Sequence, residues 1–107
     1  MSERLTLLRT FLASDPDDTF SRYALAMEYR KQGDGQGCIQ ELEILLKKDP
    51  NYVGAYYHLG KSLIQIGEHQ DAIEVFKKGI TCASQVSDTH ALKELKEALI
   101  EVELDVD

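Results

Sequence analysis

The chain of 107 residues is 43% hydrophobic and 29% charged, which suits one compact domain and is too apolar for a disordered protein. Its formal net charge of −7 argues against nucleic acid or an anionic membrane surface as the main partner. No stretch is long and apolar enough to cross a bilayer, and Arg9 interrupts an N-terminal run that would otherwise resemble a signal peptide. We therefore expect a cytoplasmic protein, complete from its initial methionine to its acidic tail.

Apolar spacing predicts six helices joined by short polar connections, so that successive helices should be antiparallel neighbours. The predicted ranges, in chain order, are 2–14, 19–32, 37–48, 52–66, 69–83 and 87–104. The third helix is expected to begin late, at residue 37, because Gly35 and Gly37 of the segment GDGQG weaken a helix. The predicted fold class is all-α.

The first helix, 2–14, introduces a pattern that recurs every 34 residues. Its apolar stripe returns in the third and fifth helices: Leu5, Leu8 and Leu12; Ile39, Leu42 and Leu46; Ile73, Phe76 and Ile80. The stop signals recur too, since Asp15-Pro16 returns as Asp49-Pro50, and Gly33 returns as Gly67. The repeating unit is therefore a helix–turn–helix of 34 residues.

Small residues stand where the two helices of each unit would cross. We expect Ala26 to face Cys38 in the first unit and Gly60 to face Ala72 in the second, because two helices approach closely only at small side chains. Cys38 and Cys82 both lie on apolar stripes, so they are interpreted as buried hydrophobes in a reducing compartment and not as a disulfide.

This combination resembles the tetratricopeptide repeat (TPR) family, whose pattern is a large aromatic, Leu-Gly, Tyr, then Ala, an aromatic four residues later and a closing Pro. Residues 53–86 match as Tyr56, Leu59-Gly60, Leu63, Ala72 and Phe76, with Ser84 in place of the proline. Residues 19–52 match more loosely, as Arg22, Leu25-Ala26, Tyr29, Cys38, Leu42 and Pro50. The resemblance implies a single domain over 1–107, an antiparallel helix-pair stack in a right-handed superhelix. It would consist of an N-terminal helix 2–14, repeats 19–52 and 53–86, and a capping helix 87–104.

The last helix, 87–104, departs from the repeat. A shift of 34 residues places Lys93-Glu94 on Leu59-Gly60, so the small-residue contact is lost. Its own apolar stripe, Leu92, Leu95, Leu99 and Val102, favours an amphipathic cap over the open end of the stack. A leucine zipper is the alternative, although the helix holds fewer than three heptads.

No catalytic or metal-binding pattern is found. His58, His69 and His90 lie on different segments without a second ligand at metal-binding spacing, and GDGQG lacks the strand and Lys of a phosphate loop. The carboxylates of the third and fifth helices are predicted to be solvated: Glu41, Glu43, Asp71 and Glu74. We therefore expect no enzyme, no cofactor and no metal site.

The exposed faces of the first helices of each pair should line a concave groove. Its predicted binding residues are Phe20, Tyr23, Met27, Arg30, Lys31, Tyr57, Lys61 and Ile64. Helices 19–32 and 52–66 carry four basic residues against Glu28 alone, a balance of +3 that favours an acidic peptide or a C-terminal carboxylate. The chaperone-tail clamp of the family is absent, because Tyr23, Met27 and His58 stand at its positions.

The predicted function is a non-catalytic protein–protein interaction module that binds a short peptide or helix, as the family resemblance implies. The alternative is a structural protein that forms a homo-oligomer through its end helices or its concave face. In favour of this alternative, helix 2–14 lacks a first-helix partner, which leaves one side of Leu5 and Leu8 in question.

Overall fold

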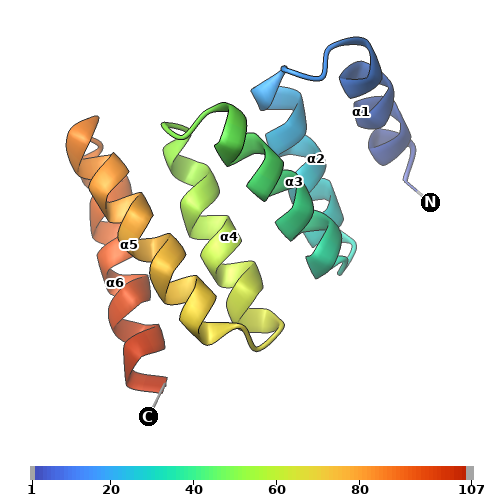
Figure 1. The fold of residues 1–107 in the computed structure, drawn as a ribbon. Helices are drawn as coiled ribbons and strands as arrows, with labels where there is room; N and C mark the ends of the chain where they lie inside the picture. Colours follow the sequence, from blue (N-terminus) through green and yellow to red (C-terminus); the bar gives the residue numbers. More distant parts are fainter. Residues whose placement is uncertain (1, 106–107) are drawn as a thin grey trace.

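The computed structural model describes residues 2–105, and these residues form six helices. The helices are α1 Glu3–Ser14, α2 Thr19–Lys31, α3 Gly35–Lys48, α4 Val53–Gln65, α5 His69–Gln85 and α6 Thr89–Asp105. They follow one another across the molecule as antiparallel neighbours, from α1 at one end to α5 and α6 at the other (Figure 1). The all-α prediction is confirmed, and none of these helices is long and apolar enough to cross a membrane.

The prediction that the third helix begins at residue 37 is wrong, because α3 begins at Gly35. The Asp34 carboxylate caps the helix by accepting a hydrogen bond of 2.9 Å from the Gly37 amide. A Cβ at Gly37 would lie 2.7 Å from Asp34 Oδ2 and 2.9 Å from Tyr29 Cγ. Gly37 thus makes room for the cap and for the end of α2, so this glycine supports the start of the helix that it was expected to delay.

The turns within the two helix pairs are alike. Gly33 and Gly67 take left-handed backbone angles, with φ of +80° and +85°. The next amide in each turn then reaches back across the helix end: Asp34 donates to the Tyr29 carbonyl at 2.9 Å, and Glu68 donates to the Leu63 carbonyl at 2.8 Å. The predicted helix stops at both glycines are confirmed.

The connection from α5 to α6 differs from the Asp-Pro turn that ends α3. With Ser84 in place of the repeating proline, α5 continues to Gln85, and Ser87, two residues beyond the helix, has a φ of +60°. The longer helix delays α6, which starts 36 residues after α4 (89 − 53) and not 34. The structural counterparts of Leu59-Gly60 are therefore Leu95-Lys96, and the predicted alignment with Lys93-Glu94 is wrong.

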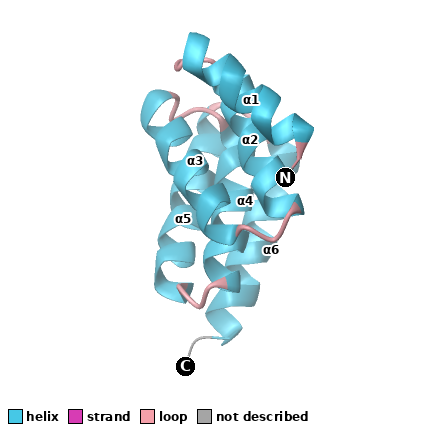
Figure 2. Ribbon diagram, turned by 90° about the vertical axis from the view of Figure 1, so that its right-hand side faces the viewer, coloured by secondary structure: helices cyan, strands magenta, loops and turns pink. Residues whose placement is uncertain are grey.

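The helices form two layers, with α3 and α5 along one side of the molecule and α2, α4 and α6 along the other (Figure 2). The main core lies between them and includes Leu42, Leu45, Phe76, Leu95 and Val102, all nearly inaccessible to solvent. The predicted apolar face of α6 covers the end of this core against α4 and α5.

A second, smaller core joins α1 to α2 and contains Leu5, Leu8, Leu12 and Leu25. Leu5 and Leu8 are buried at 3% and 7% exposure, so they are not the residues that α1 leaves uncovered. Those residues are Leu7 and Phe11, about half exposed on another side of the helix.

The close crossing of α4 and α5 depends on Gly60, whose nearest neighbour is the Phe76 ring. A Cβ at Gly60 would lie 2.2 Å from Phe76 Cε1, and the three nearest atoms all belong to the Phe76 ring rather than to Ala72. Gly79, which the repeat pattern did not single out, makes a second such contact, since its Cβ would lie 2.6 Å from Tyr56 Cβ. Two aromatic side chains thus pack against two glycines.

The pair α2–α3 contains an ion pair near its crossing. Arg22 Nη1 lies 2.7 Å from Glu41 Oε1, and Arg22 Nη2 donates to the Pro16 carbonyl at 2.9 Å. Both side chains are largely buried, with 11% and 17% exposure. The prediction that Glu41 is solvated is therefore wrong.

Candidate functional site

A row of aromatic rings crosses the side of the molecule formed by α2 and α4. The ring of Tyr23 on α2 lies 5.1 Å from that of Tyr52 and 5.9 Å from that of His58, and His58 lies 5.4 Å from Tyr57, centroid to centroid. The contacts are tilted or edge-on, the arrangements that aromatic rings prefer. We call the side of α2, α4 and α6 that carries this row and the residues beside it the first-helix face.

Arg30 of α2 and His58 of α4 form a polar contact on this face. Arg30 Nη1 lies 2.6 Å from His58 Nδ1, and because a guanidinium only donates, Nδ1 is the acceptor and carries no proton. Burial, followed by the charge of Arg30, lowers the pKa of His58 from its ordinary value. His58 is therefore a neutral ring at pH 7.

The first hollow on the face lies between α1 and α2 and has a volume of about 580 Å³. It is lined by Arg4, Phe20, Tyr23, Ala24, Met27, Glu28 and Lys31. Phe20 is 73% exposed, so a large apolar surface stands open to solvent at its edge. A hollow with an exposed aromatic residue and a cationic rim is typical of a surface that binds another chain.

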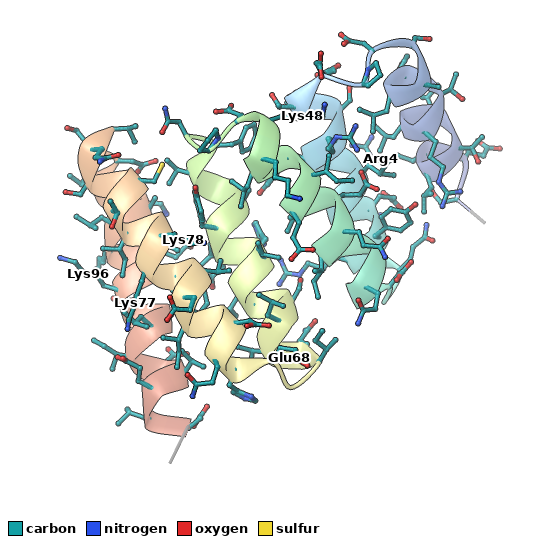
Figure 3. The ribbon with its side chains drawn as sticks, viewed as in Figure 1. Arg4, Lys48, Glu68, Lys77, Lys78 and Lys96 are labelled. Carbon is teal, nitrogen blue, oxygen red and sulfur yellow. The ribbon has the colours of Figure 1, made fainter. Side chains whose placement is uncertain are left out.

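Glu28 lines this hollow but its charge is neutralised within the protein. Its side chain is buried and pairs with Arg4 at 3.4 Å, and it accepts hydrogen bonds from Ser2 Oγ at 3.3 Å and Gln32 Nε2 at 3.2 Å. Arg4 lies where α1 meets α2 (Figure 3). The unpaired charge at this end of the face is therefore positive, from Arg30 and Lys31.

A second hollow of about 200 Å³ lies between α4 and α6. Tyr57 and Lys61 line it on the α4 side, with the Lys61 ammonium 5.9 Å from the centre of the Tyr57 ring. Ala98 and three carboxylates line it on the α6 side: Glu94, Glu97 and Glu101. This end of the first-helix face is acidic.

The eight predicted binding residues fall into three groups in the structure. Phe20, Arg30 and Lys31 are exposed, and Tyr23, Met27, Tyr57 and Lys61 are half-buried and line one of the two hollows. Ile64 is half-buried, packs against the main core and lines neither hollow.

The residues that the sequence interpretation missed are Tyr52, His58 and the three glutamates of α6. Tyr52 was predicted to begin the fourth helix and was assigned to no face, and in the structure it is the N-cap of α4. The glutamates were missed because α6 was treated only as a cap. Their spacing, i, i+3 and i+7, puts them on one side of a helix and would have grouped them.

A third hollow of about 400 Å³ opens on the opposite side, between α3 and α5. Its lining includes Tyr56 and Leu59, which are only 8% and 4% exposed, and its other apolar residues, Leu46 and Val75, are aliphatic. Lys78, at its rim, and Lys77 extend from α5 on this side (Figure 3). The first-helix face offers more exposed aromatic surface and is the better candidate site.

The residues 2–105 contain no group of three or more side chains placed to hold a metal ion. Cys38 and Cys82 are both buried and free, as predicted. Burial raises the pKa of the Cys38 thiol, whose sulfur lies 3.5 Å from Ser62 Oγ, so it is a packed thiol rather than a reactive one.

The sequence profile of the tetratricopeptide repeat matches residues 23–87, more than half of the chain. The chain belongs to the tetratricopeptide repeat family. A TPR repeat-containing protein of Pseudomonas aeruginosa is 27% identical over 88 residues, which cover 82% of this chain and 84% of that protein. A TPR domain protein of Salinibacter ruber has a similar crystal structure, with 37% identity, a TM-score of 0.79, and coverage of 84% of this chain and 99% of the other.

The complex of PcrH with the chaperone-binding region of PopD contains a similar TPR-like fold. PcrH aligns with a TM-score of 0.91 over 96% of this chain and 78% of its own, at 15% identity. At that identity the likeness shows the fold alone. The six helices in sequential antiparallel pairs are therefore a TPR-like stack, and TPR domains are protein-interaction modules that are generally non-catalytic.

Proposed function

We propose that this TPR protein binds a short segment of a partner protein on its first-helix face. The observation that supports this proposal most directly is the aromatic row from Tyr52 to Tyr57, which lies between two hollows and beside the exposed Phe20. Aromatic anchors of this kind supply most of the binding energy of small interfaces. The structure of PcrH with a region of PopD gives a precedent for segment binding within this fold.

The partner segment carries acidic groups for the α2 end of the face. Arg30 and Lys31 have no ion-pair partner among the described residues, and Lys61 stands over Tyr57 near the middle. A carboxylate would form charge-assisted hydrogen bonds to these side chains while apolar side chains pack on Phe20 and the aromatic row. The face is small, so a modest affinity is expected.

Amide chemical shifts of the isotope-labelled protein, recorded with pools of acidic and of basic peptides, test this proposal. Acidic peptides should shift the amides of Tyr23, Tyr57 and Lys61, and the variants Tyr57→Ala and Lys61→Glu should weaken that response. Lys78→Glu is the matched control, because it reverses the same charge on the opposite side of the stack. Shifts confined to α3 and α5, or an equal loss in Lys78→Glu, would contradict the proposal.

A second candidate function is self-association through α1, because Leu7 and Phe11 remain 53% and 51% exposed. The residue one period after Phe11 is Leu45, which is fully buried. Light scattering over a range of concentrations tests this candidate. A mass that rises with concentration and returns to that of a monomer in Leu7→Ser/Phe11→Ser would support it, and a constant monomer mass would exclude it.

A further inference from the structure

The first-helix face carries opposite charges at its two ends. Arg30 and Lys31 stand at the α2 end, and Glu94, Glu97 and Glu101 stand at the α6 end. None of these five side chains forms an ion pair among the described residues, since the three ion pairs of residues 2–105 are Arg4–Glu28, Arg22–Glu41 and Lys48–Asp17. The charges are therefore available to a ligand.

The α6 glutamates face the ligand-binding side and not the protein core. They lie at i, i+3 and i+7 along the helix and line one hollow with Tyr57 and Lys61. The buried stripe of α6, which includes Leu95 and Val102, points elsewhere. With Lys61 as the only cation in its lining, this hollow has a net charge of −2.

The two charged ends act on the same central ring. Burial, followed by Tyr52, raises the pKa of Tyr23, while the charge of Arg30 opposes the change and Glu94 on α6 makes a small contribution in the raising direction. The Tyr23 ring also contacts His58, and His58 contacts Tyr57, which lines the hollow with Glu94. One bound segment that lies along this row would therefore meet both ends.

We infer that the ligand of this face is a dipolar segment, with acidic residues at the α2 end and a lysine or arginine at the α6 end; this refines the proposed function and depends on it. A uniformly acidic segment would be repelled by the three glutamates, and a uniformly basic one by Arg30 and Lys31. A segment with both charges satisfies both ends and leaves its apolar side chains for Phe20 and the aromatic row.

The two charges of the ligand must be separated, because the two ends of the face lie on different helices of the stack. A helix with its side chains is about 10 Å across, so the path from α2 over α4 to α6 is about 20 Å. An extended chain covers about 3.3 Å per residue, so acidic and basic residues about six positions apart would reach the two ends. A helical ligand would need roughly twice that number, at about 1.5 Å per residue.

Selection from a random library of twelve-residue peptides displayed on phage tests the inference with the full chain as bait. We expect the selected peptides to carry Asp or Glu and Lys or Arg about six positions apart, with apolar residues between them. Against Glu94→Gln/Glu97→Gln/Glu101→Gln, the same peptides should bind about tenfold more weakly, and a new selection should lose the basic residue while it keeps the acidic one.

A variant at the start of α5, Glu68→Gln/Asp71→Asn/Glu74→Gln, is the matched control, because it removes three exposed carboxylates that line neither hollow of the first-helix face and should leave binding unchanged. Uniformly acidic peptides that bind both triple variants equally well would overturn the inference while the proposed function stands. Absence of any selected peptide, or peptides that shift only amides of α3 and α5, would overturn the proposed function and the inference together.

Discussion

The two complete helix pairs, α2–α3 and α4–α5, have the same period and the same path of the chain. The side chains that pack between their helices differ. In α4–α5, the Phe76 ring lies against Gly60 and Tyr56 lies against Gly79. In α2–α3, the residues one period earlier are Leu42 with Ala26, and Arg22 with Leu45. At the first contact the smaller Leu42 is matched by the larger Ala26, so this contact conserves volume rather than residue identity. At the second contact, α2–α3 has two large side chains, Arg22 and Leu45, where α4–α5 has a ring against a glycine.

The difference extends to the contact with the preceding turn. Tyr56 donates its hydroxyl hydrogen to the Pro50 carbonyl at 2.6 Å, and Arg22 donates to the equivalent Pro16 carbonyl at 2.9 Å. Arg22 also needs a carboxylate, which Glu41 supplies where α5 has Val75. The second repeat thus uses a tyrosine hydroxyl, and the first repeat an arginine of an ion pair, to donate a hydrogen bond to the equivalent proline carbonyl.

The largest effect is expected for Gly60→Ala, which should lower the free energy of unfolding by about 3 kcal/mol because its Cβ would enter the buried Phe76 ring. Urea unfolding followed by circular dichroism measures the loss. Adding Phe76→Leu should restore much of it, because the double variant reproduces the Ala26 and Leu42 combination of the other pair.

Gly54→Ala is the control for helix propensity, since its Cβ would make only an ordinary contact of 3.7 Å with Tyr23 Oη. It should be neutral or raise stability by up to about 1 kcal/mol. If Gly60→Ala behaved like Gly54→Ala, the two pairs would not differ in how closely their helices approach.

The next effect concerns the ion pair. Glu41→Val gives α3 the residue that α5 has, but it leaves the largely buried Arg22 guanidinium, whose Nε already has no hydrogen-bond partner, without its carboxylate. We expect a loss of about 2 kcal/mol, less than for a fully buried pair because both side chains keep some contact with water. Urea unfolding of Glu41→Val and of Arg22→Met/Glu41→Val would separate the effect of the unpaired Arg22 charge from the effect of the changed side-chain shape at residue 41. The double variant should unfold close to the wild type, and equal losses in both variants would contradict this reading.

A smaller effect is expected at the helix end where the two pairs diverge. Ser87 holds a φ of +60°, which costs a side chain energy that a glycine avoids. Ser87→Gly should therefore raise the free energy of unfolding by about 0.5–1 kcal/mol, measured by thermal or urea unfolding. Ser84→Gly, in the last turns of α5, should lower it by a similar amount. Destabilisation by Ser87→Gly would show that its left-handed angle carries no strain.

Periodicity predicted the fold well because a repeated apolar stripe and repeated stop signals limit the chain to one arrangement. The stripe from Leu5 to Ile80 and the glycines at 33 and 67 identified the helices of the repeats, and the separate stripe from Leu92 to Val102 identified α6. Periodicity could not predict the contact of Gly60 with Phe76. A helix pattern gives the face on which a residue lies, but not which side chain of the next helix packs against it. Nor could it predict that the loss of a proline at Ser84 would lengthen α5 and move the register of α6.

The candidate site was less predictable than the fold. Residues on α2 and α4 were selected by their position opposite the buried stripe, and seven of the eight are exposed or line a hollow. The acidic end was missed because the spacing within α6 does not show that its polar side faces Tyr57 and Lys61. That knowledge depends on the packing of α6 on α4, which is a tertiary property.

The smallest effect expected is a pH dependence that only one of the two pairs carries. His58 on α4 corresponds to Ala24 on α2, so the titrating ring belongs to the second pair alone. Burial and Arg30 lower its pKa in the folded protein, so the unfolded chain binds the proton more readily than the folded one. The stabilising contribution is therefore complete above the unfolded pKa of about 6.5 and is lost as the pH falls below it. Urea unfolding between pH 7.5 and pH 5 (about the range over which histidine changes charge) should show this decline in the wild type and a weaker one in His58→Gln.

His90→Gln removes an exposed histidine and should keep the wild-type slope. Parallel slopes for the wild type and His58→Gln would mean that Arg30 leaves His58 free to take up a proton in the folded protein, contrary to the contact of 2.6 Å between them.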